Sequence, residues 1–164
     1  MKTNDLSPKF KLGVHSHNVK LKNKEIKLVR NDSYFSYGNC CMVAFQDYFK
    51  LSGKELFGVL KSLNYDVNDV IRICTQGFTT NQCTRILKRI IKHLGQEDHY
   101  MVIYTPLNIN LLAFIDAVPD GNYILDFSQH ISILKNKKLI DTYIFQRVSI
   151  LSDYEICGFW KLIK

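Results

Sequence analysis

A cysteine at position 40 stands where a nucleophile would be activated. Cys40 is predicted to begin a helix, and the free N–H groups and partial positive charge of a helix N-terminus favour a thiolate over a thiol. Nucleophilic catalysis by cysteine also needs a histidine that accepts the thiol proton, and a third group that orients the histidine. The sequence offers a candidate for each of these groups.

His130 is the best candidate for the base, because it alone among the five histidines begins an apolar strand, Ile131-Ser132-Ile133-Leu134. The other four lie in a basic N-terminal segment, near a helix end or in a turn: His15, His17, His93 and His99.

Asp141 is the candidate for the orienting group. If Asn136-Lys137 is the two-residue turn of a hairpin, Ser132 pairs with Asp141 and His130 pairs with Tyr143, so all four side chains share one face. Asp141 is then diagonal to His130, at the roughly 7–8 Å that long or aromatic side chains can bridge. A loop that is one residue longer or shorter would reverse this parity.

Each of these residues also has a purely structural interpretation. A buried cysteine at a helix start is commonly a small core residue, and a histidine on a strand is commonly held by structural hydrogen bonds. Asp141 could simply bond a turn. Their joint placement makes a Cys–His–Asp site a specific hypothesis.

Apolar periodicity predicts helices in the first half of the chain and strands in the second. Ser52 and either Thr79 or Thr80 are candidate N-caps, and Gly95 is a candidate helix end. The helices are expected at about 40–51, after Ser52, from Thr79 or Thr80 to Leu94, and at 108–118; the strands are expected at 100–104, 122–127, 130–135, 138–146 and 154–163. This order predicts an α+β domain whose N-terminal helices pack on a C-terminal antiparallel sheet.

Several motifs around these residues match a known group of proteins. In chain order they are Asn39-Cys40 with Ala44 four positions after the cysteine, Gly77-Phe78-Thr79 through Leu94-Gly95, Pro119-Asp120-Gly121-Asn122-Tyr123, His130, Asp141-Thr142 and Ile156-Cys157-Gly158-Phe159-Trp160. Over about residues 37–162 the chain resembles the small papain-like cysteine peptidase domains of phages and related mobile elements, which are relatives of the peptidase domains of bacteriocin transporters.

The resemblance implies a papain-like fold over residues 34–164 and a catalytic triad. Cys40 would be the nucleophile, His130 the base that later acts as an acid, and Asp141 the group that holds the imidazole. Papain-like enzymes commonly bind the oxyanion with a Gln about six residues before the cysteine. Tyr34 stands there, so Asn39 or the Cys40 backbone N–H would have to serve.

The neighbouring Cys41 leaves a second nucleophile open. The Ala44 spacing favours Cys40, whereas a shift of one residue would exchange the two cysteines.

The implied function is hydrolysis of a peptide or isopeptide bond in a peptide or protein substrate, through an acyl-enzyme and without a metal or cofactor. The alternative is a phage virion or accessory capsid protein that keeps the papain-like scaffold, because a fold alone does not establish chemistry. Either protein is expected in the cytoplasm of a bacterial host or in the virion.

The positive charge of the 164-residue chain is concentrated at one end. Residues 1–31 hold eight of the 22 basic and two of the 15 acidic residues, so they carry +6 of the net charge of +7. We interpret residues 1–33 as a basic arm, with one or two short strands, that docks on a partner such as another virion protein. Its candidate contact residues are Lys20, Lys22, Lys24 and Lys27.

Nucleic acid is not the expected partner of this arm. The arm lacks a dense run of arginines and interleaved aromatic residues, so a solvated basic segment is favoured over a phosphate-binding one.

Composition and cysteine usage exclude several other classes. A chain with 46% hydrophobic and 23% charged residues is neither disordered, collagen-like nor a coiled coil. Five cysteines with no CxxC pair argue against a zinc site and a disulfide framework, and for reduced thiols. No apolar run reaches the roughly 18–20 residues that span a bilayer, and the N-terminus lacks the apolar stretch of a signal peptide, so no membrane association is expected.

Overall fold

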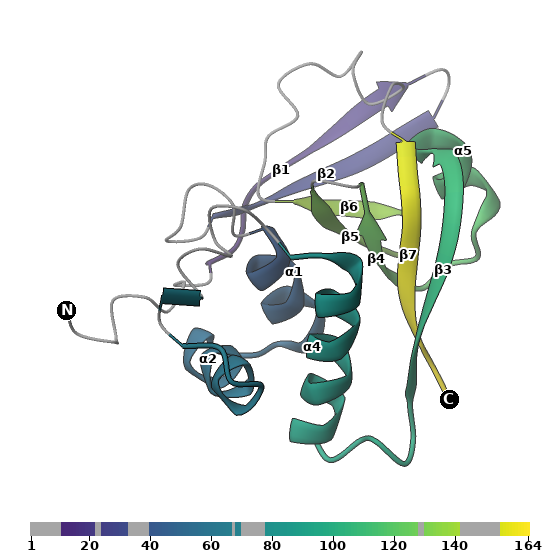
Figure 1. Ribbon diagram of the computed structural model, residues 1–164. Helices are drawn as coiled ribbons and strands as arrows, with labels where there is room; N and C mark the ends of the chain where they lie inside the picture. The colour runs from purple at the N-terminus through teal and green to yellow at the C-terminus, as the bar shows by residue number, and fades with distance from the viewer. Residues whose placement is uncertain are drawn as a thin grey trace.

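Over the residues that it describes, the computed structural model is an α+β domain built around a mixed sheet of seven strands (Figure 1). It describes residues 11–21, 24–32, 40–66, 68–69, 78–127, 130–141 and 155–164. The strands are β1 (Lys11–Leu21), β2 (Lys24–Asp32), β3 (Met101–Asn110), β4 (Asn122–Asp126), β5 (Ile131–Lys135), β6 (Lys138–Asp141) and β7 (Glu155–Ile163), and they lie in the order β1-β2-β6-β5-β4-β7-β3. The helices are α1 (Cys40–Phe49), α2 (Gly53–Ser62), α4 (Thr80–His93) and α5 (Leu111–Ala117). The predicted α+β class is confirmed.

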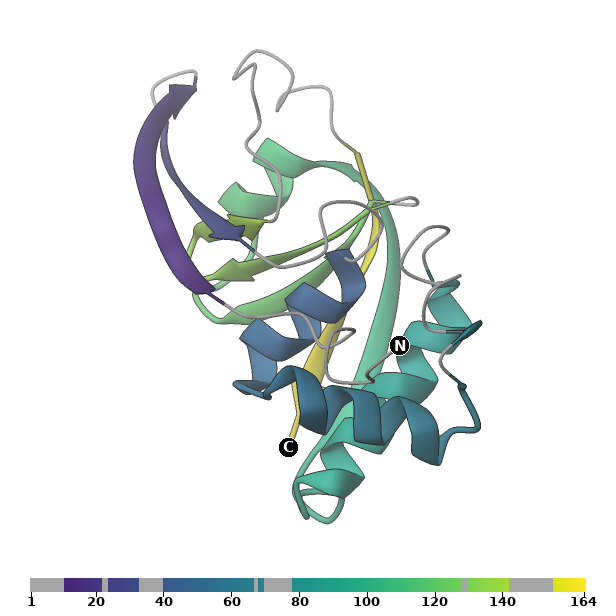
Figure 2. The same ribbon diagram turned by 90° about the vertical axis from the view of Figure 1, so that its left-hand side faces the viewer.

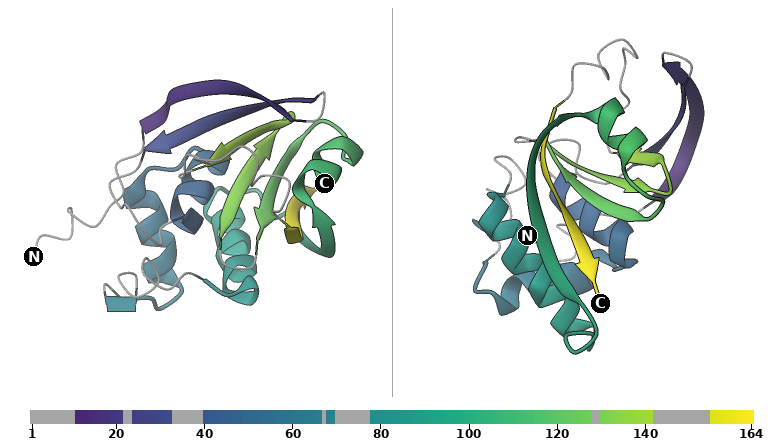
Figure 3. Two further views of the ribbon diagram at one scale, coloured as in Figure 1. Left: turned by 90° about the horizontal axis from the view of Figure 1, so that it is seen from above. Right: turned by 90° about the vertical axis from the view of Figure 1, so that its right-hand side faces the viewer.

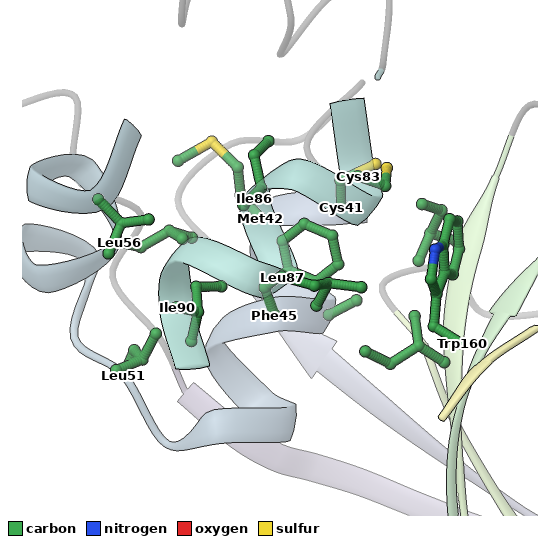
Figure 4. Packing of buried hydrophobic residues seen from close by; sticks show 14 of the residues in the cluster. Cys41, Met42, Phe45, Leu51, Leu56, Cys83, Ile86, Leu87, Ile90 and Trp160 are labelled. Atoms are coloured by element: carbon green, nitrogen blue, oxygen red, sulfur yellow. The ribbon is translucent and has the colours of Figure 1, made fainter. Parts of the chain in front are cut away.

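The sheet separates two apolar cores. The helices α1, α2 and α4 gather on one face, where their buried side chains pack with Ile124, Ile133 and Trp160 from the strands (Figures 1 and 4). On the other face, α5 packs on Tyr123 and Leu125. Successive residues of β4 therefore alternate between the two cores, as expected for a strand that is buried on both sides.

Two helices begin at the predicted caps. The Ser52 hydroxyl accepts a hydrogen bond from the Glu55 backbone N–H at 3.1 Å, and the Glu55 carboxylate accepts one from the Ser52 N–H at 2.7 Å. Thr79 and Gln82 make the same reciprocal pair at the start of α4, so Thr79 rather than Thr80 is the cap. The left-handed φ of 67° at Gly95 follows the end of α4. These capping boxes satisfy N–H groups that would otherwise lack partners.

The predicted hairpin turn at Asn136-Lys137 is confirmed. Both residues have positive φ angles, 47° and 68°, which are typical of a tight two-residue hairpin turn. The strands pair Lys135 with Lys138 and Ile133 with Ile140. Asp141 follows Ile140 at the end of β6, and the Ser132 hydroxyl donates to the Ile140 carbonyl at 2.9 Å.

Two predicted helix boundaries were wrong, and the strand predicted at 100–104 was too short. α1 ends at Phe49 rather than Leu51, because Lys50 has a left-handed φ of 57°. The helix expected at 108–118 begins only at Leu111, because the Asn110 side chain caps it by accepting from the Leu112 N–H at 2.9 Å. β3 therefore runs to Asn110 and pairs with β7 over almost its whole length.

The sheet is neither wholly antiparallel nor wholly C-terminal, which corrects the prediction. β1 and β2 form an antiparallel hairpin within the basic segment, and β2 then pairs in parallel with β6, from Lys27–Lys138 to Arg30–Asp141. Figures 2 and 3 show this hairpin along one edge of the sheet, with β3 at the other edge. The basic segment thus adds strands next to the hairpin that contains Asp141. Its proposed boundary at residue 33 stays an interpretation.

Gly158 in β7 leaves room for the Tyr104 side chain of β3 to lie across β7 and reach β4. A Cβ atom at this position would lie 2.3 Å from the Tyr104 hydroxyl oxygen and 2.8 Å from the Thr105 carbonyl oxygen. The Tyr104 hydroxyl can therefore reach the Asp126 carboxylate, which it meets at 2.9 Å. A glycine is required here because of close approach, without a positive φ.

We expect Gly158→Ala to destabilise the protein by about 1–3 kcal/mol, since both the β3 backbone and Tyr104 must move. Gly58→Ala is the matched control. Gly58 lies in α2 with open space around its missing Cβ, so its replacement should stabilise the helix by up to about 1 kcal/mol. Urea unfolding of the two variants measures both effects, and equal midpoints would contradict the packing argument.

Candidate active site

Cys40 is the first residue of α1 and belongs to the larger core. Its exposed fraction is 8%, so the thiol is nearly but not fully enclosed. The helix packs against β5 and buries Met42 and Phe45 beside α4 (Figure 4). Its position at the helix start is therefore fixed by the apolar stripe on the same helix.

His130 lies at the tight connection between β4 and β5. Asp126 pairs with Ile131, and the Phe127 N–H donates to the His130 carbonyl at 2.8 Å, so the connection is closed just beyond the strand ends. The rings of Phe127 and His130 lie 6.1 Å apart. The imidazole is half-buried, and its backbone is held by the hairpin.

The structure brings Cys40 and His130 into contact. A side-chain hydrogen bond and a charge interaction with His130 both act to lower the pKa of the Cys40 thiol. The two residues come from separate elements, a helix start and a strand start, that are far apart in the sequence. This is the pairing that a proton transfer from sulfur to imidazole requires.

The third predicted group is described only by its backbone. Asp141 ends β6, where it pairs with Arg30 of β2, and its side chain lies outside the described part of the chain. Asn39, Tyr34 and Tyr143 also lie outside the described residues. The orienting role of Asp141 and the oxyanion role of Asn39 stay predictions.

The basic arm is likewise described by its backbone. Lys20 lies in β1, whereas Lys24 and Lys27 lie in β2. Lys22 lies outside the described residues. The partner-binding role of these lysines stays a prediction.

A row of thiols, which sequence analysis did not identify, extends from Cys40 into the core. Cys40 hydrogen-bonds Cys41, and Cys41 hydrogen-bonds Cys83 of α4. The bond with Cys41 favours the protonated form of Cys40, and the bond with Cys83 favours the protonated form of Cys41. Only the place of Cys83 on the apolar stripe of α4 hinted at this contact, and such a position does not distinguish a relay from a core residue.

The resting Cys40 is a neutral thiol, contrary to the expectation from the helix N-terminus. Its pKa is held well above the usual value of 9.0, first by the hydrogen bond to Cys41 and second by burial, and His130 offsets these only in part. The pKa of Cys41 is also raised. The hydrogen bond with Cys40 lowers this pKa, but the hydrogen bond with Cys83 and burial together raise it by more.

A buried carboxylate, also missed from sequence, holds the strand that leads to His130. Asp126 at the end of β4 accepts hydrogen bonds from the Tyr104 hydroxyl at 2.9 Å and the Thr80 hydroxyl at 3.2 Å. Burial, followed by the bond to Asp126, raises the pKa of Tyr104, so the phenol stays protonated and donates. These bonds connect β3, β4 and the first turn of α4 beside the β4–β5 connection.

A buried ion pair fixes the other end of α1 to β5. The Lys135 ammonium lies 3.1 Å from the Asp47 carboxylate and also donates to the Asp47 carbonyl at 3.1 Å. Lys50 lies 2.9 Å from the same carboxylate oxygen, but its side chain is 59% exposed against 20% for Lys135. Burial lowers the pKa of Lys135, and Asp47 opposes that effect. Since Cys40 begins α1 and His130 precedes β5, the ion pair sets their relative position.

No family model, curated protein or solved structure matches this chain. Within the described part of the chain, no helix is long and apolar enough to cross a membrane, and no group of three or more His, Cys, Asp or Glu side chains is arranged to hold a metal ion. The contacts within the chain therefore carry the functional argument.

We expect Lys135→Met to destabilise the protein by about 3 kcal/mol, because it leaves the buried Asp47 carboxylate with only an exposed partner. Lys50→Met, which removes the exposed partner of the same oxygen, should cost less than about 1 kcal/mol. Chemical denaturation compares the two variants. A larger loss for Lys50→Met would contradict the assignment of the ion pair to Lys135.

Replacing Cys41 by Ala should accelerate alkylation of Cys40 at pH 7–8. The hydrogen bond to Cys41 is the largest cause that raises the pKa of Cys40, and each unit by which that pKa falls increases the thiolate fraction about tenfold. His130→Ala should have the opposite effect. The rate of iodoacetamide labelling at Cys40, followed by mass spectrometry between pH 6 and 10, measures both.

Cys157→Ala is the control for this experiment, because Cys157 lies on β7 outside the row of thiols. Its replacement should leave the rate at Cys40 unchanged. A slower reaction in Cys41→Ala than in the unmodified protein would show that Cys41 does not hold Cys40 in the thiol form.

Proposed function

We propose that this protein is a cysteine hydrolase of peptide or isopeptide bonds, with a papain-like fold and a Cys40–His130–Asp141 triad. The observation that carries the proposal is the contact between Cys40 and His130 across the helix–sheet interface. The motif spacing around these residues supports it independently.

Cys40 is the better nucleophile of the two adjacent cysteines. Cys40 contacts His130 and is partly accessible, whereas the contacts of Cys41 are with Cys40, Cys83 and Phe78, inside the core. A nucleophile must lie within hydrogen-bond reach of its base. The contacts therefore support the choice that the Ala44 spacing favoured.

The proposed reaction begins with a proton transfer. In the resting site the proton is on sulfur, because the pKa of the thiol is raised, and His130 receives it as Cys40 attacks the acyl carbon. The imidazolium then gives its proton to the leaving amine, which produces an acyl-enzyme. Water, activated by His130, resolves this intermediate and restores the thiol. Asp141 would stabilise the imidazolium, and Asn39 or the Cys40 N–H would bind the oxyanion.

Substrate binding must contribute to the activation of the Cys40 thiol. A thiol that is 8% exposed and neutral at rest needs an acyl group that enters the site and disturbs the bond to Cys41. We infer that substrate binding, rather than a preformed ion pair, generates the nucleophile. The expected location stays the cytoplasm of a bacterial host or the virion.

A second candidate function follows from the same burial. A nearly enclosed thiol with a raised pKa suits a papain-like scaffold that has become a virion or accessory capsid component without chemistry. In that case the contact between Cys40 and His130 would be a structural hydrogen bond.

An acyl probe distinguishes the two candidates. We expect a peptidyl vinyl sulfone or a peptide thioester to modify the unmodified protein at a single site, Cys40, as measured by intact-mass and peptide analysis. Cys40→Ala should abolish the reaction, and His130→Ala should slow it by at least about a hundredfold. Cys41→Ala is the matched control for a missing thiol and should still react.

Equal labelling of the unmodified protein and Cys40→Ala would end the hydrolase proposal. Labelling that moves to Cys41 in every preparation would exchange the roles of the two cysteines. No reaction with any acyl probe, in a protein that unfolds cooperatively, would favour the structural candidate.

A further inference from the structure

The row of three thiols is more than acyl transfer requires. A cysteine hydrolase needs one sulfur, but here Cys41 bonds Cys40 on one side and Cys83 on the other. Figure 4 shows the sulfur atoms of Cys41 and Cys83 next to each other at the contact between α1 and α4. Their exposed fractions fall inward, from 8% at Cys40 to 3% at Cys41 and 0% at Cys83.

The row of thiols has a partly accessible end at Cys40 and a fully buried end at Cys83. Among the contacts of the described residues, Cys40 is the thiol of the row that meets a base, His130, and it is the most accessible of the three to a small oxidant. Cys83 is fully buried on the same helix, α4, as the buried Ile86, Leu87 and Ile90, and it touches Cys41. The described cysteines are all free thiols, so all three members of the row are in the reduced form.

We propose that Cys40, Cys41 and Cys83 form a redox relay, in which a hydroperoxide oxidises Cys40 and the oxidation ends as a reversible Cys41–Cys83 disulfide between α1 and α4. This chemistry does not rest on the hydrolase proposal, because it uses only the contacts among the thiols and His130.

The first step oxidises Cys40. His130 takes the proton from sulfur, the sulfur attacks one oxygen of the hydroperoxide, and the O–O bond breaks. The leaving oxygen takes the proton back from the imidazolium. With hydrogen peroxide the products are a sulfenic acid at Cys40 and one molecule of water.

The second and third steps move the oxidation inward. The Cys41 thiol attacks the Cys40 sulfur, the S–O bond breaks, and a second water leaves with the Cys41 proton. The resulting disulfide joins adjacent residues of a helix, so it is strained and easily attacked. Cys83 then attacks the Cys41 sulfur, and Cys40 leaves as a thiol with the Cys83 proton. Overall, two thiols and one peroxide give one disulfide and two waters.

The relay protects Cys40 from irreversible oxidation. Cys40 returns to the reduced state while the oxidising equivalents are stored between two buried sulfurs. Without an inner thiol, the sulfenic acid at Cys40 would proceed to the irreversible sulfinic acid.

Peptide mapping of the full-length protein tests the relay directly. The reduced protein is treated with hydrogen peroxide, free thiols are blocked with iodoacetamide, and the chain is cleaved with chymotrypsin, which separates Cys74 from Cys83 by cutting after Phe78. We expect a peptide that links Cys41 to Cys83, with Cys40 alkylated, and we expect dithiothreitol to reverse the link. Three alkylated cysteines, a sulfinic acid at Cys40, or a link from Cys41 to any other cysteine would overturn the proposal.

Recovery of Cys40 gives a second, independent readout. After peroxide and then dithiothreitol, Cys41→Ala, which lacks the thiol that attacks the sulfenic acid, should retain at least about fivefold less alkylatable Cys40 than the unmodified protein, with sulfinic acid in its place. Cys157→Ala is the control and should recover fully. Equal recovery in Cys41→Ala and the unmodified protein would overturn the relay.

The two proposals fail separately. Loss of the acyl-probe reaction with a mapped Cys41–Cys83 disulfide would refute only the hydrolase. An intact acyl-probe reaction at Cys40 with no such disulfide would refute only the relay. If Cys41→Ala does not fold, the map of the unmodified protein still decides the question.

Discussion

The position of α1 across β5 is the constraint on which the candidate site depends. Cys40 belongs to the helix and His130 to the connection that leads into the strand, so any sliding of one element past the other would separate sulfur from imidazole. Apolar packing alone resists such sliding weakly, because it is not directional. The bond between Lys135 and Asp47 supplies direction, since a buried ion pair in one geometry stabilises one register of helix and strand. It acts at the end of the contact opposite to Cys40.

The His130 end is held by different chemistry. Asp126 ends β4 immediately before the β4–β5 connection. Its carboxylate accepts hydrogen bonds from the hydroxyl groups of Tyr104 on β3 and Thr80 on α4. Gly158 makes this possible by leaving room for the Tyr104 ring. The two ends of the helix–sheet contact are thus fixed by one ion pair and one charged hydrogen-bond network, and the apolar core fills the space between them. A site formed by distant elements needs such support from both sides.

Local signals in the sequence predicted most of this scaffold. Helix caps and tight turns depend on side chains within a few residues, so the caps at Ser52 and Thr79 and the turn at Asn136-Lys137 are visible in the sequence. The turn also determines the register of β5 and β6. The parallel pairing of β2 with β6 depends on segments far apart in the chain, which no local pattern specifies. The thiol contact between Cys41 and Cys83 is also non-local. The expected thiolate at Cys40 was wrong for the same reason, because the helix N-terminus is a local effect whereas burial and the bond to Cys41 come from packing.

A neutral thiol beside a base has a consequence that an ion pair would not have. A thiolate at Cys40 would be exposed to oxidants at all times, whereas a thiol kept protonated by burial and by the bond with Cys41 reacts only when its proton moves to His130. The same bond that lowers resting reactivity also places Cys41 where it can attack an oxidised Cys40, with Cys83 next in line. Low resting reactivity and rapid repair therefore have one structural origin, the inward row of thiols.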